Sequence, residues 1–156
     1  MNQSPAHADR QFASRRVRKP RVLLVDDDAS VRESLGLALE SENFGIIPAS
    51  NSQEALEKYF EGSIDLVLLD LNMPENAGWD TFERLTALNP YLAIIVVTQR
   101  LDQRDQTAVA GAAALVGKPL NVPSLVQIMN RLLEESFESR IHRAATQRSA
   151  VLPGYD

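Results

Sequence analysis

The chain has 156 residues, a net charge of −5 at pH 7 and 44% hydrophobic residues, which fits one globular domain with roughly 20 to 35 residues left for tails. It has no cysteine and only two histidines, so the sequence excludes disulfides, thiolate catalysis and cysteine-based zinc sites, and it argues against histidine-ligated metals and Ser-His-Asp triads. Neither a secretory signal nor an apolar run near the ~18 residues of a membrane span is present, and we expect a cytoplasmic protein without membrane contact.

The charge is unevenly distributed along the chain. The segment up to Arg21 carries six basic residues and one acidic residue, whereas the remainder carries 10 basic and 20 acidic residues. We expect residues 1–20 to be a basic, disordered leader. The alternative is an arm that contacts nucleic acid or an acidic partner surface. Because no DNA-reading motif accompanies the basic residues, we do not expect this chain to bind nucleic acid.

The regular pattern begins after Pro20. The run RVLLVDDD (21–28) is continuously apolar until its acids, which is typical of a parallel strand buried on both faces. Residues 29–41 then show helical spacing. A second strand is expected at 45–50, at an edge of the sheet because it contains Pro48, and the capping residues of SNSQEALEKYF (50–60) predict a short helix.

The same alternation continues through the second half of the chain. Apolar strands are expected at 64–70 (IDLVLLD), 92–98 (LAIIVVT) and 112–117 (AAALVG). Between them lie a predicted helix at 78–90, stopped by Asn-Pro, and a weakly amphipathic helix at 102–111. Five strands alternating with five helices, counting the last helix, predict an α/β fold with a doubly wound, five-stranded parallel sheet.

The last helix and the tail set the domain boundaries. Asn121 is expected to cap a helix with Pro123 in its first turn. We place the domain at residues 21–135 and a C-terminal tail at 136–156. Because Phe137 and Ile141 continue an i, i+4 stripe, this tail can extend the last helix.

Polar residues follow several of the predicted strands, at the sheet edge where ligands of open parallel sheets bind. These residues are Asp26, Asp27 and Asp28 after the first strand, Asp70 ending the third, Thr98 ending the fourth and Lys118 after the fifth. Each has an ordinary alternative reading, such as a helix cap for Asp28 or a solvated lysine for Lys118. Together, however, three neighbouring carboxylates repel one another unless a cation lies between them.

This set of groups suits a hard divalent ion and a phosphoryl group. Mg²⁺ typically binds one or two carboxylates, water and phosphate oxygens. An ionised carboxylate can attack phosphorus directly and form an acyl phosphate, without a general base. A lysine and a divalent ion would stabilise the charge on the transferring oxygens.

The motifs LLVDDD, LVLLDLNMP, VVT and GKPL, in this order and spacing, resemble the receiver domain of two-component response regulators over about residues 21–135. The resemblance implies a flavodoxin-like sheet with the order 2-1-3-4-5. It further implies that Asp70 is the phosphoacceptor, and that Asp26, Asp27, Asp70 and the backbone carbonyl of Asn72 form an Mg²⁺ site. Thr98 and Lys118 would contact the phosphoryl group.

The resemblance also implies partners and a switch. A sensor histidine kinase or a phosphotransfer protein would donate the phosphoryl group, and the chain would catalyse only its own Mg²⁺-dependent phosphorylation and dephosphorylation. Phosphorylation would draw Thr98 inward and remodel the face made by the fourth helix, fifth strand and fifth helix, through which a homodimer could form. Beyond residue 135 the remaining segment is too short for an output domain, so the chain is a stand-alone receiver or part of a longer regulator.

Two residues depart from the family pattern. Leu115 replaces the usual aromatic residue, and Gln99 replaces the usual small residue after Thr98. The main alternative function is therefore a pseudo-receiver that binds partners without phosphorylation. A haloacid-dehalogenase-like phosphatase would need a second aspartate at Asn72, and a flavodoxin-like binder would need a phosphate loop in place of the three acids.

Overall fold

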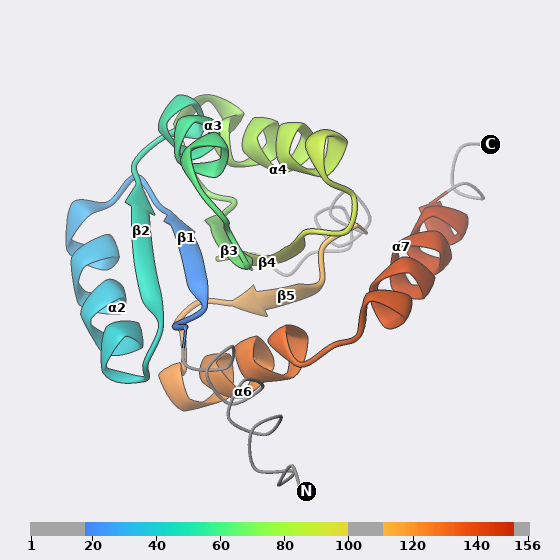
Figure 1. Ribbon diagram of the computed structural model, residues 1–156. Coiled ribbons are helices and arrows are strands. Elements are labelled where there is room, and N and C mark those ends of the chain that lie inside the picture. The colour runs from blue at the N-terminus through green and yellow to red at the C-terminus, as the bar shows by residue number, and fades with distance from the viewer. Residues whose placement is uncertain (1–17, 100–110, 152–156) are drawn as a thin grey trace, which may run out of the picture.

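The computed structural model describes residues 18–99 and 111–151, with side chains up to residue 145 in the last helix. Element labels follow Figure 1. The strands are β1 (Arg21–Val25), β2 (Gly45–Ala49), β3 (Leu66–Asp70), β4 (Ala93–Thr98) and β5 (Ala114–Gly117). The helices are α2 (Ala29–Ser41), α3 (Ser52–Glu61), the 3-10 turn η1 (Pro74–Asn76), α4 (Ala77–Leu88), α6 (Val122–Leu133) and α7 (Phe137–Val151). The helix predicted at 102–111 lies outside the described residues.

The sheet has five parallel strands in the order β2-β1-β3-β4-β5, which confirms the predicted fold. Strand β2 lies at an edge, as its Pro48 predicts, because proline cannot donate a backbone hydrogen bond. Strands β3 and β4 are buried along their whole length. This burial explains their continuous apolar sequences, since both faces of a parallel sheet are covered by helices.

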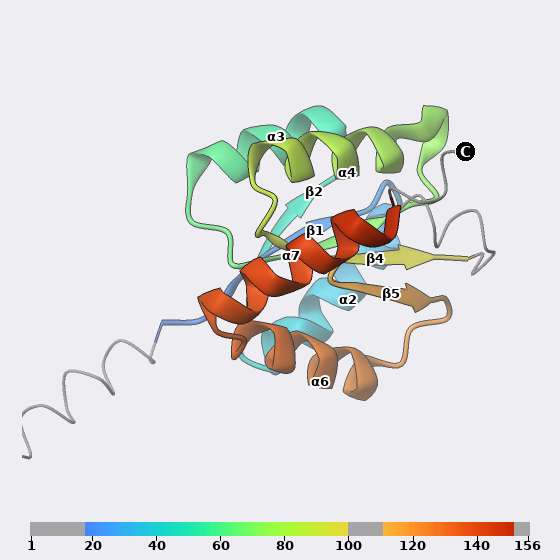
Figure 2. The ribbon, with the colours of Figure 1, turned by 90° about the vertical axis from the view of Figure 1, so that its right-hand side faces the viewer.

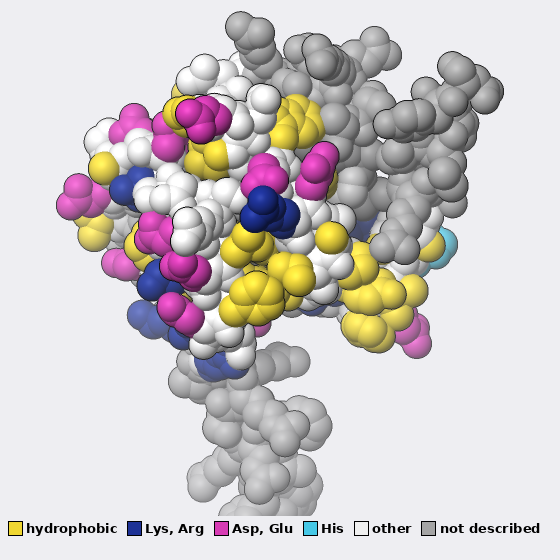
Figure 3. All heavy atoms as spheres, turned by 90° about the horizontal axis from the view of Figure 1, so that it is seen from above, with side chains coloured by type: hydrophobic (Ala, Val, Ile, Leu, Met, Phe, Trp, Pro, Cys, Tyr) yellow, Lys and Arg dark blue, Asp and Glu magenta, His cyan; other side chains and the backbone are white. Residues whose placement is uncertain are grey.

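Two helical layers cover the sheet (Figure 1). Helices α2 and α6 pack on one face, around Leu39, Leu68 and Met129. Helices α3 and α4 cover the other face, around Leu69 and Phe82. On the outer side of α3 and α4, acidic and basic side chains are interspersed and hydrophobic side chains form small separate groups (Figure 3). Within the described ranges, none of the helices combines the length and apolar character that a membrane span requires.

Local capping fixes where the helices begin. Asp28 caps α2 by accepting hydrogen bonds from the backbone N–H groups of Ser30 and Val31, and Asn121 caps α6 by accepting from Ser124. Helix α2 is followed by Asn43, whose φ of 72° is left-handed, a conformation that ends the helix and turns the chain into β2. These caps were predicted from the sequence and are confirmed.

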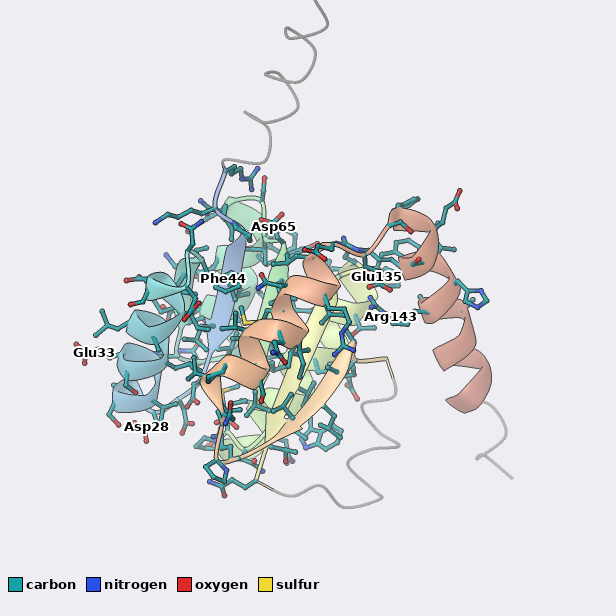
Figure 4. The ribbon with its side chains drawn as sticks, turned by 90° about the horizontal axis from the view of Figure 1, so that it is seen from below. Asp28, Glu33, Phe44, Asp65, Glu135 and Arg143 are labelled. Carbon is teal, nitrogen blue, oxygen red and sulfur yellow. The ribbon has the colours of Figure 1, made fainter. Side chains whose placement is uncertain are left out.

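The C-terminal tail does not extend α6 without interruption, which corrects that expectation. Helix α6 ends at Leu133, and the hydroxyl of Ser136 accepts a hydrogen bond from the backbone N–H of Ser139, which starts α7 as a separate helix. In Figure 2, α7 passes in front of β4 and β5. The rings of Phe137 and Tyr91 meet edge to face with centroids 6.0 Å apart. Arg143 on α7 pairs with Glu135, and Figure 4 places the two side chains next to each other.

Candidate functional site

The carboxyl ends of the inner strands bring the predicted site residues together. Asp26 directly follows β1, and Asp70 ends the adjacent strand β3. Both side chains are buried. Thr98 ends β4 and is fully buried, and Lys118 directly follows β5. A cleft at this edge of the sheet is lined by Asp26, Asp70 and Lys118, by Asp27, Asp28, Asn72 and Gln99, and by apolar residues of α2 and of the segment after β5.

Three carboxylates lie close enough to hold one metal ion. One oxygen from each of Asp26, Asp27 and Asp70 lies within 4.8 Å of the other two, and Asp27 is the exposed member of the set. Oxygen ligands at a solvent-accessible position suit a hard divalent cation that keeps several water molecules. Among the described residues, this acidic triad therefore provides a fitting metal site.

The electrostatics of the site are set mainly by the burial of Asp26. Burial raises the pKa of its carboxyl group, and the charges of Asp70 and Asp27 raise the pKa further. The backbone N–H of Asp28, which donates to Oδ1 of Asp26 at 2.9 Å, and the charge of Lys118 lower this pKa and so partly offset the effect. A bound cation would therefore stabilise the ionised form of the Asp26 carboxylate.

Within the described part of the chain, Lys118 is the basic residue that faces both buried acids. Its Nζ lies 3.4 Å from Oδ2 of Asp70 and 3.9 Å from Oδ2 of Asp26. The following peptide bond, Lys118–Pro119, is cis. A buried anion that binds between Lys118 and the metal site would meet a positive charge on each side, as a phosphoryl group in transfer requires.

The side chain of Asn72 makes contacts that the sequence did not reveal. Its Oδ1 accepts hydrogen bonds from the backbone N–H of Gln99 at 2.7 Å and from Oγ1 of Thr98 at 3.3 Å. Its own backbone N–H donates to Oδ1 of Asp70 at 2.9 Å. Asn72 therefore joins the acidic residue of β3 to the end of β4, in addition to the backbone role expected for it.

Gly78 is a second residue whose importance the sequence analysis missed. A Cβ atom on Gly78 would lie 2.6 Å from the carbonyl oxygens of both Asp70 and Leu71. The chain reaches this position through Glu75 and Asn76, both with left-handed φ near 60°. Only glycine allows the first turn of α4 to pack so closely against the loop after β3.

The two departures from the family pattern lie in different environments. Gln99 is exposed and lines the cleft beside Asp70 and Lys118. Leu115 is half-buried in β5 and packs against the apolar core between the sheet and α3 and α4. Gln99 is thus placed to affect access to the acids, whereas Leu115 is part of the core.

Comparison with known proteins identifies the family. The family model of the response regulator receiver domain matches residues 22–130. The chain is 35% identical over 121 residues to the transcriptional regulatory protein CpxR of Escherichia coli, which covers 76% of this chain and 51% of CpxR. It is 32% identical over 134 residues to the transcriptional regulatory protein ResD of Bacillus subtilis, which covers 85% of this chain and 55% of ResD. The chain spans about half the length of these two relatives.

Solved structures give the same result. The response regulator protein TrrA from Thermotoga maritima, crystallised in complex with Mg(2+)-BeF, is 33% identical with a TM-score of 0.67, over 72% of this chain and 98% of that one. A CheY-like receiver domain protein from Methanospirillum hungatei is 28% identical with a TM-score of 0.70, over 75% and 95% of the two chains. This chain therefore belongs to the response regulator receiver domain family.

Proposed function

We propose that the chain is a phosphorylation-dependent signalling switch in which Asp70 accepts a phosphoryl group. The proposal rests mainly on the position of the Asp70 carboxylate, which lies 3.4 Å from Nζ of Lys118 and within 4.8 Å of carboxylate oxygens of Asp26 and Asp27. An ionised carboxylate at this position attacks phosphorus, an O–P bond forms, and the bond from phosphorus to its donor breaks. The leaving group departs with the bonding electrons and takes a proton from solvent.

Mg²⁺ is the ion that we propose for the acidic triad. Asp26, Asp27, Asp70 and the backbone carbonyl of Asn72 would hold it, and when bound it neutralises charge on the transferring oxygens. Lys118 holds the opposite side of the phosphoryl group by charge-assisted hydrogen bonds. The chain thus carries the groups for its own phosphorylation and dephosphorylation and needs no further catalytic residue.

The proposed partner is a sensor histidine kinase or a phosphotransfer protein of a two-component system. Phosphohistidine would supply the phosphoryl group, and we propose that the transfer takes place in the cytoplasm. The names of CpxR and ResD support a regulator of transcription, with this chain as its phosphorylated part. We expect the chain itself to make no contact with nucleic acid.

Thr98 is the residue that we propose to sense the phosphoryl group, because its hydroxyl lies at the end of the strand next to Asp70. The face that includes β5 and α6 would be remodelled and would support a homodimer. Because Leu115 stands where the family usually has an aromatic residue and packs against the core, the movement of Thr98 proceeds without rotation of an aromatic ring.

Mass spectrometry after incubation with acetyl phosphate and Mg²⁺ tests the phosphoacceptor. The wild type is expected to gain about 80 Da, the mass of one phosphoryl group, and the Asp70→Asn variant is expected to gain nothing. Equal labelling of both proteins would place the site elsewhere. No labelling of the wild type, together with no effect of beryllofluoride, would favour the pseudo-receiver, for which Gln99 beside the cleft is the supporting observation.

A further inference from the structure

The side-chain amide of Asn72 has one orientation that its neighbours allow. The backbone N–H of Gln99 can only donate, so the atom of Asn72 that lies 2.7 Å from it is the carbonyl oxygen. The same oxygen lies 3.3 Å from Oγ1 of Thr98, and since an amide oxygen only accepts, the Thr98 hydroxyl donates. One oxygen thus holds both residues at the end of β4.

The loop that carries Asn72 is fixed to the phosphoacceptor. Its backbone N–H donates to Oδ1 of Asp70, and the preceding residue, Leu71, donates its N–H to the carbonyl oxygen of Val97 at 2.8 Å. Asn72 therefore contacts both the carboxylate of Asp70, which reacts in the proposed function, and the hydroxyl of Thr98, which senses the phosphoryl group. A change at Asp70 reaches Thr98 through the same short loop.

We propose that the Asn72 side chain is a latch that holds Thr98 in the unphosphorylated conformation, and that phosphorylation of Asp70 opens it by competing for one proton. This inference rests on the proposed function. A threonine hydroxyl has one proton to donate. A phosphoryl group offers charged oxygen acceptors, whose hydrogen bonds are roughly twice as strong as that of a neutral amide oxygen. The Thr98 hydroxyl therefore exchanges Asn72 for the phosphoryl group, while Gln99 keeps its bond to Asn72.

The latch predicts how the affinity for beryllofluoride changes when the Asn72 side chain is removed. Without the amide oxygen, the unphosphorylated state loses a hydrogen bond that the phosphorylated state does not have, so the switch responds more readily. The Asn72→Ala variant is expected to reach half-saturation with beryllofluoride at an about twofold lower concentration, because the 3.3 Å distance from Oγ1 of Thr98 to Oδ1 of Asn72 makes this a weak neutral hydrogen bond.

The experiment is a double-mutant cycle by isothermal titration calorimetry at saturating Mg²⁺. It compares the wild type, Asn72→Ala, Thr98→Val and the double variant. The latch predicts that Asn72→Ala tightens binding when Thr98 is present and has no effect in the Thr98→Val background. An unchanged affinity in Asn72→Ala, or equal tightening in both backgrounds, would overturn the proposal.

A second measurement needs no ligand and separates the latch from the proposed function. In the ligand-free protein, Asn72→Ala is expected to speed the hydrogen exchange of the Gln99 amide, because its acceptor is gone. Unchanged exchange at Gln99 would overturn the latch even where Asp70 is phosphorylated normally. If exchange at Gln99 is faster in Asn72→Ala but the wild-type protein binds no beryllofluoride, the proposed function is overturned instead, and with it the role of the latch in switching.

Discussion

The ammonium group of Lys118 lies 3.4 Å from Oδ2 of Asp70, and both side chains are largely withdrawn from solvent. Replacing this lysine by an uncharged residue of similar length leaves the buried acids Asp70 and Asp26 without their cation. Lys118→Met is therefore expected to lower the free energy of unfolding at pH 7, without metal, by about 1–3 kcal/mol.

Urea denaturation followed by circular dichroism measures this change, and the control is Lys58→Met. Lys58 pairs with Glu61 on the surface at 3.5 Å, with both side chains well exposed. An exposed pair of this kind contributes about 0.3–0.5 kcal/mol. Equal losses in the two variants would contradict the importance of the buried position of Lys118.

The raised pKa of Asp26 predicts how stability depends on pH. Because burial raises this pKa above its ordinary value of 3.8, the folded state keeps the proton to a higher pH than the unfolded state. The contribution of Asp26 to stability therefore decreases as the pH rises from about 3.8 through the folded-state pKa. Asp26→Asn is expected to be more stable than the wild type at pH 7 without metal, with a difference that shrinks toward pH 4.

Thermal denaturation between pH 4 and 8 checks this prediction. Mg²⁺ is expected to stabilise the wild type more than Asp26→Asn, because the variant loses one carboxylate ligand. A constant difference between the two proteins over the whole pH range would show that ionisation of Asp26 is not its cause.

Gly78 is predicted to be intolerant of any side chain. Gly78→Ala forces a Cβ atom to 2.6 Å from two backbone oxygens that no side-chain rotation can move, so we expect a loss of about 1–3 kcal/mol in the free energy of unfolding. Gly36→Ala in α2 is the matched control. Its added Cβ would lie 3.7 Å from the nearest side-chain atom, and alanine favours the helix by about 0.5–1 kcal/mol. A neutral Gly78→Ala would refute the close contact.

Helix α7 is predicted to open independently of the core. Phe137 is 66% exposed, whereas Met129 of α6 is fully buried. Phe137→Ala is therefore expected to speed amide exchange in α7 with at most about 1 kcal/mol lost from global stability. Met129→Ala is expected to cost about 2–5 kcal/mol and to affect the whole domain. Hydrogen exchange followed by mass spectrometry distinguishes the two, and joint exchange of α6 and α7 would contradict the prediction.

Gln99 is predicted to slow the reaction of small donors at Asp70, because its exposed side chain lines the cleft. Gln99→Ala is expected to increase the rate of acetyl phosphate labelling several-fold without changing the final extent. Gln53→Ala, at an exposed position on α3, is the control that should leave the rate unchanged. A labelling rate in Gln99→Ala equal to that of the control would remove Gln99 as a cause of altered kinetics.

Much of the fold follows from local signals in the sequence. The caps at Asp28 and Asn121 act on backbone groups two or three residues away, so they can be recognised from the sequence alone. The edge position of β2 follows from Pro48, whose missing N–H forbids a strand on that side. The convergence of Asp26, Asp70 and Lys118 follows from the parallel sheet, because its carboxyl ends share one edge.

Other features depend on contacts that no local pattern contains. The hydrogen bond from Gln99 to Asn72 joins residues 27 positions apart and depends on the register of β3 and β4. The close approach of Gly78 depends on two successive left-handed residues, neither of which is glycine. The break after α6 depends on Ser136, whose hydroxyl starts a new helix although the apolar spacing continues across it.

The contact of Gly78 with the loop after β3 has a practical consequence. The next residue, Trp79, is the only tryptophan of the chain, and it packs half-buried against the core. Since the first turn of α4 rests directly on the backbone of Asp70 and Leu71, we expect a shift of that backbone to alter the surroundings of the indole ring. The fluorescence of Trp79 in the unlabelled protein is therefore expected to change when Asp70 is phosphorylated.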